Sequence, residues 1–178
     1  MKKLILLFAI TLTLNCCNKD DDSTNDTLPP ATQTGANTVG CLVNGEVFLP
    51  KAEGINPAVV VNYEFINGEF FFGLSFRDQR GTGVKTVGVG TQRVNLEANE
   101  TYILDKNEFD NGDFTGGGGA YSLSSSDIYV TTSIITGELT ITRVDTSNSI
   151  ISGTFWFDAI NENGEIVEIR EGRFDYEY

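Results

Sequence analysis

Two apolar runs separated by Asn67-Gly68 constrain the fold of this chain more than any other stretch. The runs are Val59–Ile66 and Glu69–Phe76, and Asn-Gly favours a two-residue hairpin turn because both turn positions need a positive φ. Such a turn pairs Val59 with Phe76, Val61 with Leu74, Tyr63 with Phe72, and Phe65 with Phe70. Every pair on this face is apolar, and a slip of one residue would turn the face to water, so the sequence predicts a defined register.

The rest of the chain repeats short β-branched and aromatic runs between turns. Further strands are predicted at Val39–Val43, Glu46–Leu49, Val84–Gly90, Gln92–Leu96, Thr101–Leu104, Ala120–Leu123, Ile128–Thr132 and Gly137–Val144. No stretch after residue 15 has a sustained helical period. We therefore predict one all-β domain over residues 39–178, an antiparallel β-sandwich of about eight to ten strands, with a β-barrel as the alternative.

The end of the chain predicts a second hairpin. Its first strand is Ile150–Ile160, and a three-residue loop with Gly164 in the left-handed region pairs Phe157 with Ile169. A two-residue loop would instead place apolar residues opposite charged ones. The apolar phase of the last strand changes after Ile169, and we predict a β-bulge at Gly172.

The segment Asp105–Gly119 is predicted to be irregular and is rich in carboxylates. Clustered oxygen ligands suit calcium, but the EF-hand spacing is absent, and a solvated loop is the interpretation we favour. The run Gly116–Gly119 lacks the lysine and hydroxyl residue of a phosphate-binding loop, so we interpret it as a flexible lead into the next strand.

The N-terminus resembles a bacterial lipoprotein signal. Lys2 and Lys3 precede the apolar segment Leu4–Leu14, which is too short to span a membrane and has the length of a secretory signal. The resemblance implies a signal peptide over residues 1–16 and a lipid on Cys17, with Cys16 as the alternative because two cysteines are adjacent. Lipid chains on this cysteine would anchor the protein to a membrane without spanning it.

The residues after Cys17 resemble the surface-export signal of Bacteroidota lipoproteins. Lys19 is followed by Asp20, Asp21 and Asp22, and the resemblance implies transport to the outer face of the outer membrane. A simple charged tether, with the protein on the periplasmic face, is the alternative. Residues 17–38 are polar and proline-containing, so we predict a lipidated flexible tether there.

Composition excludes several classes of function. The formal net charge is −13, which opposes binding to nucleic acid because that requires a basic surface. The chain has no histidine, which removes Ser-His-Asp and Cys-His catalysis and histidine metal ligands. With the other two cysteines in the signal, Cys41 is predicted to be a small buried hydrophobe rather than a reactive thiol. We predict no metal and no cofactor.

Trp156 and Arg170 are the candidate ligand contacts. Trp156 is the only tryptophan, is out of phase with the apolar residues of its strand, and falls close to Arg170 in the preferred register. An exposed tryptophan beside carboxylates is typical of sugar-binding surfaces, because its ring stacks on the apolar faces of sugars. The simpler interpretation, which we favour, is that the ring packs on the Arg170 side chain.

Two segments, CLVNGEVF and SGTFWFDAINENGEIVEIREGRFDYEY, resemble uncharacterised Bacteroidota lipoproteins with one small all-β domain. That resemblance implies a lipoprotein without an assigned activity. We expect a non-enzymatic binding or interaction module with a glycan or protein ligand. An accessory subunit of a cell-envelope complex is the alternative, and a carboxylate-dependent hydrolase is the least favoured.

Overall fold

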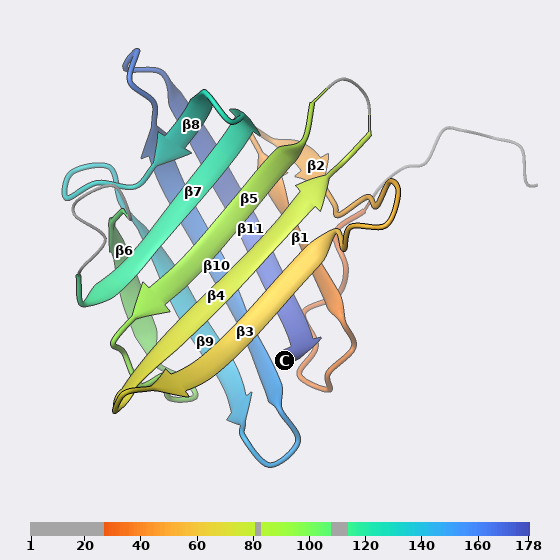
Figure 1. Ribbon diagram of the computed structural model, residues 1–178, viewed down its shortest axis with the longest axis vertical. Coiled ribbons are helices and arrows are strands. Elements are labelled where there is room, and N and C mark those ends of the chain that lie inside the picture. The colour runs from red at the N-terminus through yellow and green to blue at the C-terminus, as the bar shows by residue number, and fades with distance from the viewer. Residues whose placement is uncertain (1–26, 81–82, 108–113) are drawn as a thin grey trace, which may run out of the picture.

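The chain forms a two-layered β fold, shown in Figure 1 as a computed structural model that describes residues 27–80, 83–107 and 114–178. Within these ranges lie eleven strands. They are β1 (Thr38–Val43), β2 (Glu46–Phe48), β3 (Val59–Ile66), β4 (Glu69–Asp78), β5 (Lys85–Gln92), β6 (Thr101–Lys106), β7 (Gly116–Ser124), β8 (Asp127–Val130), β9 (Gly137–Asp145), β10 (Ile150–Ile160) and β11 (Ile166–Glu177). The predicted all-β, sandwich-like class is confirmed, with slightly more strands than expected. The described residues include no helix with the length and hydropathy needed to cross a membrane.

One continuous sheet folds over to make both layers. Its strand order is β2-β1-β11-β10-β9-β6-β7-β5-β4-β3, and β8 pairs with both β7 and β10. Strands β3, β4, β5 and β7 form the front layer of Figure 1, and β1, β9, β10 and β11 cross behind them as the back layer. The strand pairings are antiparallel except that of β6 with β7, which is parallel and was not expected.

The two predicted hairpins are confirmed residue by residue. Strands β3 and β4 pair Val59 with Phe76 and Phe65 with Phe70, and Asn67 and Gly68 both have positive φ. Strands β10 and β11 pair Phe157 with Ile169, and the turn between them contains Gly164 at φ 81°. These registers follow from local turn chemistry and the two-residue side-chain period.

The bulge in β11 lies just before the predicted position. The β10 register shifts between Phe155 and Phe157, so that Arg170 and Glu171 together face one residue, and Glu171 has a φ of 51°. The residue after the bulge, Gly172, is a glycine because the Phe155 ring leaves no room for a side chain: a Cβ there would lie 2.4 Å from a ring carbon. The prediction of a bulge at Gly172 itself was therefore wrong by one or two residues.

Two other predictions about the middle of the chain were wrong. The separate strand predicted over Gln92–Leu96 is absent from the described residues: β5 ends at Gln92, and Arg93 turns the backbone with a φ of 59°. Gly116–Gly119 is not a flexible lead but part of β7, and it pairs with β5. The glycines let β6 lie close along the other edge of β7. A Cβ at Gly118 would prevent this, because it would lie 2.4 Å from the Lys106 carbonyl oxygen.

Aromatic residues dominate the core between the layers. Phe72 of the front layer stacks on Phe174 of the back layer at 5.7 Å, and Phe76 contacts Phe155 at 6.3 Å. These residues come from the alternate positions that the sequence assigned to the apolar faces. Cys41 is fully buried in the same core, as predicted.

Residues 27–37, which the sequence predicts to belong to the tether, lie along the fold and are held by Asp175. The Asp175 carboxylate accepts hydrogen bonds from three hydroxyl groups and three backbone amides. The donors are Thr32 Oγ1 (2.7 Å), Ser152 Oγ (2.7 Å), Thr34 Oγ1 (3.4 Å), Thr34 N (2.8 Å), Gly35 N (2.8 Å) and Ala36 N (3.1 Å). Burial opposes ionisation of Asp175, but these hydrogen bonds outweigh it and hold its pKa far below the usual range.

Candidate ligand-binding groove

The outer face of the front layer carries small residues that align across neighbouring strands. The strand registers define two adjacent rows of this face. One row is Asn62, Gly73, Gly90 and Gly118, and the other is Val60, Ser75, Gly88, Ala120 and Val130. The alternate positions of the same strands point inward and carry core residues such as Leu74 and Val89. The inner side of the sheet therefore carries large apolar side chains, whereas these two rows of the outer side carry mostly small ones.

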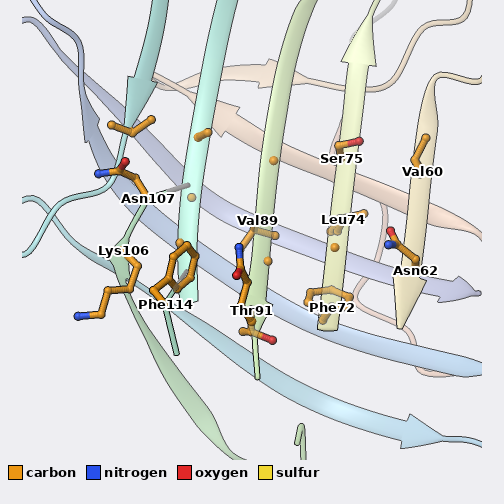
Figure 2. Close-up of a pocket in the computed structure, with 18 residues that line it drawn as sticks. Val60, Asn62, Phe72, Leu74, Ser75, Val89, Thr91, Lys106, Asn107 and Phe114 are labelled. Atoms are coloured by element: carbon orange, nitrogen blue, oxygen red, sulfur yellow. The ribbon is translucent and has the colours of Figure 1, made fainter. Parts of the chain in front are cut away.

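The small residues in the middle of these rows form the floor of a groove of about 370 Å³, which we call the glycine groove; they are Gly73, Ser75, Gly88, Gly90, Gly118 and Ala120. Figure 2 shows Val60 and Asn62 on its β3 side, and Lys106, Asn107 and Phe114 on its β7 side. The described walls thus come from the edge strand β3 of the front layer, from Lys106 and Asn107 at the end of β6, and from Phe114 before β7. The walls therefore carry large side chains, whereas the floor between them carries almost no side-chain atoms.

Thr131 fixes the wall on the β7 side. Its hydroxyl group is fully buried, donates to the Lys106 carbonyl at 2.5 Å, and accepts from the Gly119 amide at 3.0 Å. The chain between β8 and β9 thereby holds the end of β6 against β7. The Lys106 ammonium group lies 3.3 Å from the Asp105 carboxylate, so its charge is locally balanced.

The fold requires only some of the floor glycines. A Cβ at Gly90 would lie 2.6 Å from the Phe72 carbonyl oxygen, which the backbone cannot accommodate. A Cβ at Gly88 would have no neighbour closer than 3.8 Å, and at Gly73 the closest atom is the movable Asn62 side chain at 3.1 Å. Neither residue has the positive φ that demands glycine. At these two positions the absence of a side chain keeps the groove open without a need from packing.

The chemistry of the groove differs from that of the whole chain. The described residues that line it include no aspartate or glutamate, although the chain has 25 acidic residues. Its polar side chains are mainly the amides of Asn62, Gln92 and Asn107 and the hydroxyl of Ser75, and Phe114 adds an aromatic ring. Amides both donate and accept hydrogen bonds. This lining suits an uncharged ligand that carries many hydrogen-bonding groups.

A polar hollow of about 630 Å³ continues from the groove and shares Asn107 and Val130 with it. Asn161 lines this hollow and links the chain around it, because its amide nitrogen donates to Asp127 at 3.2 Å and to Glu165 at 2.9 Å. The hollow therefore extends the groove with a more acidic surface.

The predicted contacts Trp156 and Arg170 lie together, on the outer face of the back layer. The Arg170 guanidinium is 5.5 Å from the centre of the Trp156 ring, which matches the predicted register. The ring N–H donates to Glu138 at 3.2 Å, and Arg170 pairs with Asp158 at 2.6 Å. Both side chains thus have partners within the domain, beside a shallow hollow of about 370 Å³. A role in ligand contact stays a prediction.

The remaining predicted positions are only partly described. Cys16, Cys17, Lys19 and Asp20–Asp22 lie outside the described residues, as does the centre of the Asp105–Gly119 segment. No group of three or more aspartate, glutamate or cysteine residues that could hold a metal ion occurs in the described ranges. Burial raises the pKa of the Cys41 thiol, which disfavours the nucleophilic thiolate.

Sequence reasoning did not find the glycine groove. The signal was present in Lys85–Gln92, where Val87 and Val89 alternate with glycines, and again in the glycines of β7. Each strand alone looks like a weak strand with small residues on its solvent side. The floor becomes visible only when the order and register of four strands are known.

Comparison with curated proteins and with solved structures found no match. Residues 80–176, more than half of the chain, match the family DUF6252, a domain of unknown function. The matched region includes β5, β7 and the groove wall on the β7 side. An uncharacterised family was expected from the sequence, and the chain belongs to the DUF6252 family.

Proposed function

We propose that this protein is a lipid-anchored outer-membrane protein, exposed at the cell surface, whose domain is a non-enzymatic binding module. The observation that carries the proposal is the glycine groove, in which two glycines not required by packing keep a floor open between walled sides. A concave surface with a few converging polar groups is the usual form of a binding site.

The N-terminal residues support the anchoring part of the proposal. The basic residues, the short apolar segment and Cys17 have the order of a lipoprotein signal, and Lys19 with Asp20–Asp22 has the order of a Bacteroidota export signal. The hydrogen bonds that Asp175 accepts from residues 32–36, which we call the clamp at Asp175, limit the length of the tether. Residues from 32 onward are bound to the folded domain, so a lipid on Cys17 would be connected by a short tether.

A binding role is favoured over catalysis by the chemistry of the groove. Glycoside hydrolysis uses two carboxyl groups at the bond to be cleaved, and the described groove lining supplies none. The chain also lacks the histidine that most acid–base and nucleophilic mechanisms use. The amides and the aromatic ring of the groove are suited to holding a ligand without changing it.

One observation favours the second candidate, a subunit of an envelope complex. Among the described strands β3 pairs only with β4, and the tip of their hairpin exposes Phe65 (63%) and Ile66 (45%). An unpaired strand edge with exposed apolar residues is suited to contact another protein. The Trp156 and Arg170 surface would be a further contact area for this second function.

Surface exposure is tested by protease treatment of intact cells. We expect the wild-type protein to be cleaved, and a variant with alanine at Lys19 and Asp20–Asp22 to be protected until the cells are lysed. Protection of the wild-type protein in intact cells would contradict surface exposure and favour the envelope-subunit function on the periplasmic face.

Use of the groove is tested by photo-crosslinking in living cells. Benzoylphenylalanine reacts with nearby C–H bonds of any ligand, so it can be placed at position 60, where Val60 is a groove wall that is 41% exposed. Position 134 is the control, because Ile134 is 85% exposed and does not line the groove. We expect high-mass adducts from position 60 only. Equal adducts from both positions, or none, would refute the groove as the binding surface.

A further inference from the structure

We infer that the ligand of the glycine groove is a neutral glycan, bound as a short chain of sugar rings lying across the strands. This inference rests on the proposed function, because it names the ligand class of the same groove. It is drawn from the direction of the groove floor, the state of the backbone beneath it, and the side chains that surround it.

The floor runs perpendicular to the strands. Its rows pass from β3 through β4 and β5 to β7, following the hydrogen-bonding direction of the sheet. Neighbouring strands are about 4.8 Å apart, so the floor is roughly 14 Å long between β3 and β7. This length accommodates an extended ligand of several rings rather than one small molecule.

The backbone beneath the floor cannot bind a peptide in the usual way. Gly73, Gly88 and Gly90 lie in strands paired on both sides, so their amides and carbonyls already face sheet partners. A peptide that adds to a sheet needs an unpaired edge, and a peptide lying across the strands would leave most of its own backbone groups without partners. A sugar chain has no such continuous set of amide groups to satisfy.

The walls offer the two contacts that a sugar ring needs. The bare glycine floor and Phe114 provide flat apolar surfaces, and the faces of sugar rings are rich in C–H groups that pack on aromatic rings. The amides of Asn62 and Gln92 and the hydroxyl of Ser75 lie at the edges, where each can donate to or accept from a sugar hydroxyl.

Charge selects a neutral glycan over an acidic one. Among the described lining residues the one cationic side chain is Lys106, which lies 3.3 Å from the Asp105 carboxylate and is already balanced. The whole chain carries a formal charge of −13, so a polymer of uronic acids or sulfated sugars would be repelled. The described lining presents no carboxylate that would favour a cationic sugar.

The test is retention of the purified full chain, in mild detergent, by gels that contain one polysaccharide each. The neutral probes are starch, a β-glucan, xylan and mannan, and the acidic probe is polygalacturonate. Gly88→Leu fills the floor at a position where a Cβ would meet no atom closer than 3.8 Å and where the cross-strand neighbours Ser75 and Ala120 are small, so the fold can accept it. Thr86→Leu is the matched control, because Thr86 lies on the same strand and face but does not line the groove.

We expect retention by at least one neutral probe, a loss of at least tenfold in affinity in Gly88→Leu and in Phe114→Ala, and no change in Thr86→Leu. Circular dichroism of each variant establishes that the strands are intact. Retention by none of the neutral probes, or retention that Gly88→Leu does not weaken, would overturn the inference. A groove-dependent adduct at position 60 that is digested by protease, together with no glycan retention, would overturn the glycan class while leaving the binding module in place.

Discussion

Replacing Asp175 with asparagine should release the N-terminal segment from the fold. The two oxygens of Asp175 have different partners: Oδ1 accepts from Gly35 N and Ser152 Oγ, and Oδ2 accepts from Thr32, Thr34 and Ala36. An asparagine has the same shape but only one accepting oxygen. In its better orientation the amide nitrogen faces the Gly35 N–H, where it cannot accept, while the Ser152 hydroxyl can rotate and accept instead.

The expected loss of stability follows from these contacts. A hydrogen bond to a charged group is worth about 1.5–3 kcal/mol, and Asp175→Asn removes one such bond and the charge from the others. Residues 32–36 are partly exposed, so water can replace some of the lost contacts. We therefore expect the free energy of unfolding to fall by about 3 kcal/mol, which lowers Tm by roughly 6–12 °C for a domain of this size.

The pH dependence of the effect has a definite sign. Because the folded-state pKa of Asp175 is depressed, its ionised form stabilises the fold fully above the unfolded-state value of about 3.9, and this stabilisation is lost as pH falls towards the folded-state pKa. The difference between wild type and Asp175→Asn should be constant at neutral pH and should shrink below about pH 4.

Thermal and urea unfolding, followed by the fluorescence of Trp156, measures this difference. Hydrogen exchange at the amides of Thr34, Gly35 and Ala36 should accelerate in Asp175→Asn. The control is Glu168→Gln on the same strand, since Glu168 is mostly exposed and lies 3.7 Å from Arg170, and it should cost less than about 0.5 kcal/mol. A Tm for Asp175→Asn within about 2 °C of wild type, with unchanged exchange, would refute the clamp.

Three further outcomes are expected. Gly137→Ala should destabilise by about 3 kcal/mol in urea unfolding, since its Cβ would lie 2.2 Å from the Trp156 carbonyl oxygen, whereas Gly88→Ala should not destabilise; equal effects would contradict the packing described. Cys41 should be alkylated by iodoacetamide only after unfolding, as peptide mapping can show, and rapid labelling of the native protein would disprove its burial. Trp156→Phe and Arg170→Ala should leave polysaccharide retention unchanged, and a loss would move the binding site to the back layer.

The hairpins could be predicted from the sequence because their causes are local. Asn67-Gly68 sets a turn, and the apolar period then sets which residues of the two strands face each other. The same logic placed Phe157 opposite Ile169, and placed Trp156 beside Arg170. Burial of Cys41 followed from its position in a strand and the absence of an activating neighbour.

The remaining features depend on contacts between distant parts of the chain. Four consecutive glycines look like a flexible loop until β6 lies so close to β7 that a Cβ at Gly117 would meet the Ile103 carbonyl at 2.9 Å. The clamp at Asp175 joins residues about 140 positions apart. The groove floor combines β3, β4, β5 and β7, and no single strand reveals it.

Amide chemical shifts show directly whether ligands bind on the outer face of the front layer. Glycine amides fall in a separate region of the nitrogen–proton spectrum, so Gly73, Gly88, Gly90 and Gly118 can be followed individually while oligosaccharides of the best-retained neutral polysaccharide are added. We expect shifts at these four glycines and none at the indole N–H of Trp156. Shifts at Trp156 with unmoved groove glycines, or no shift at any of these positions, would contradict it.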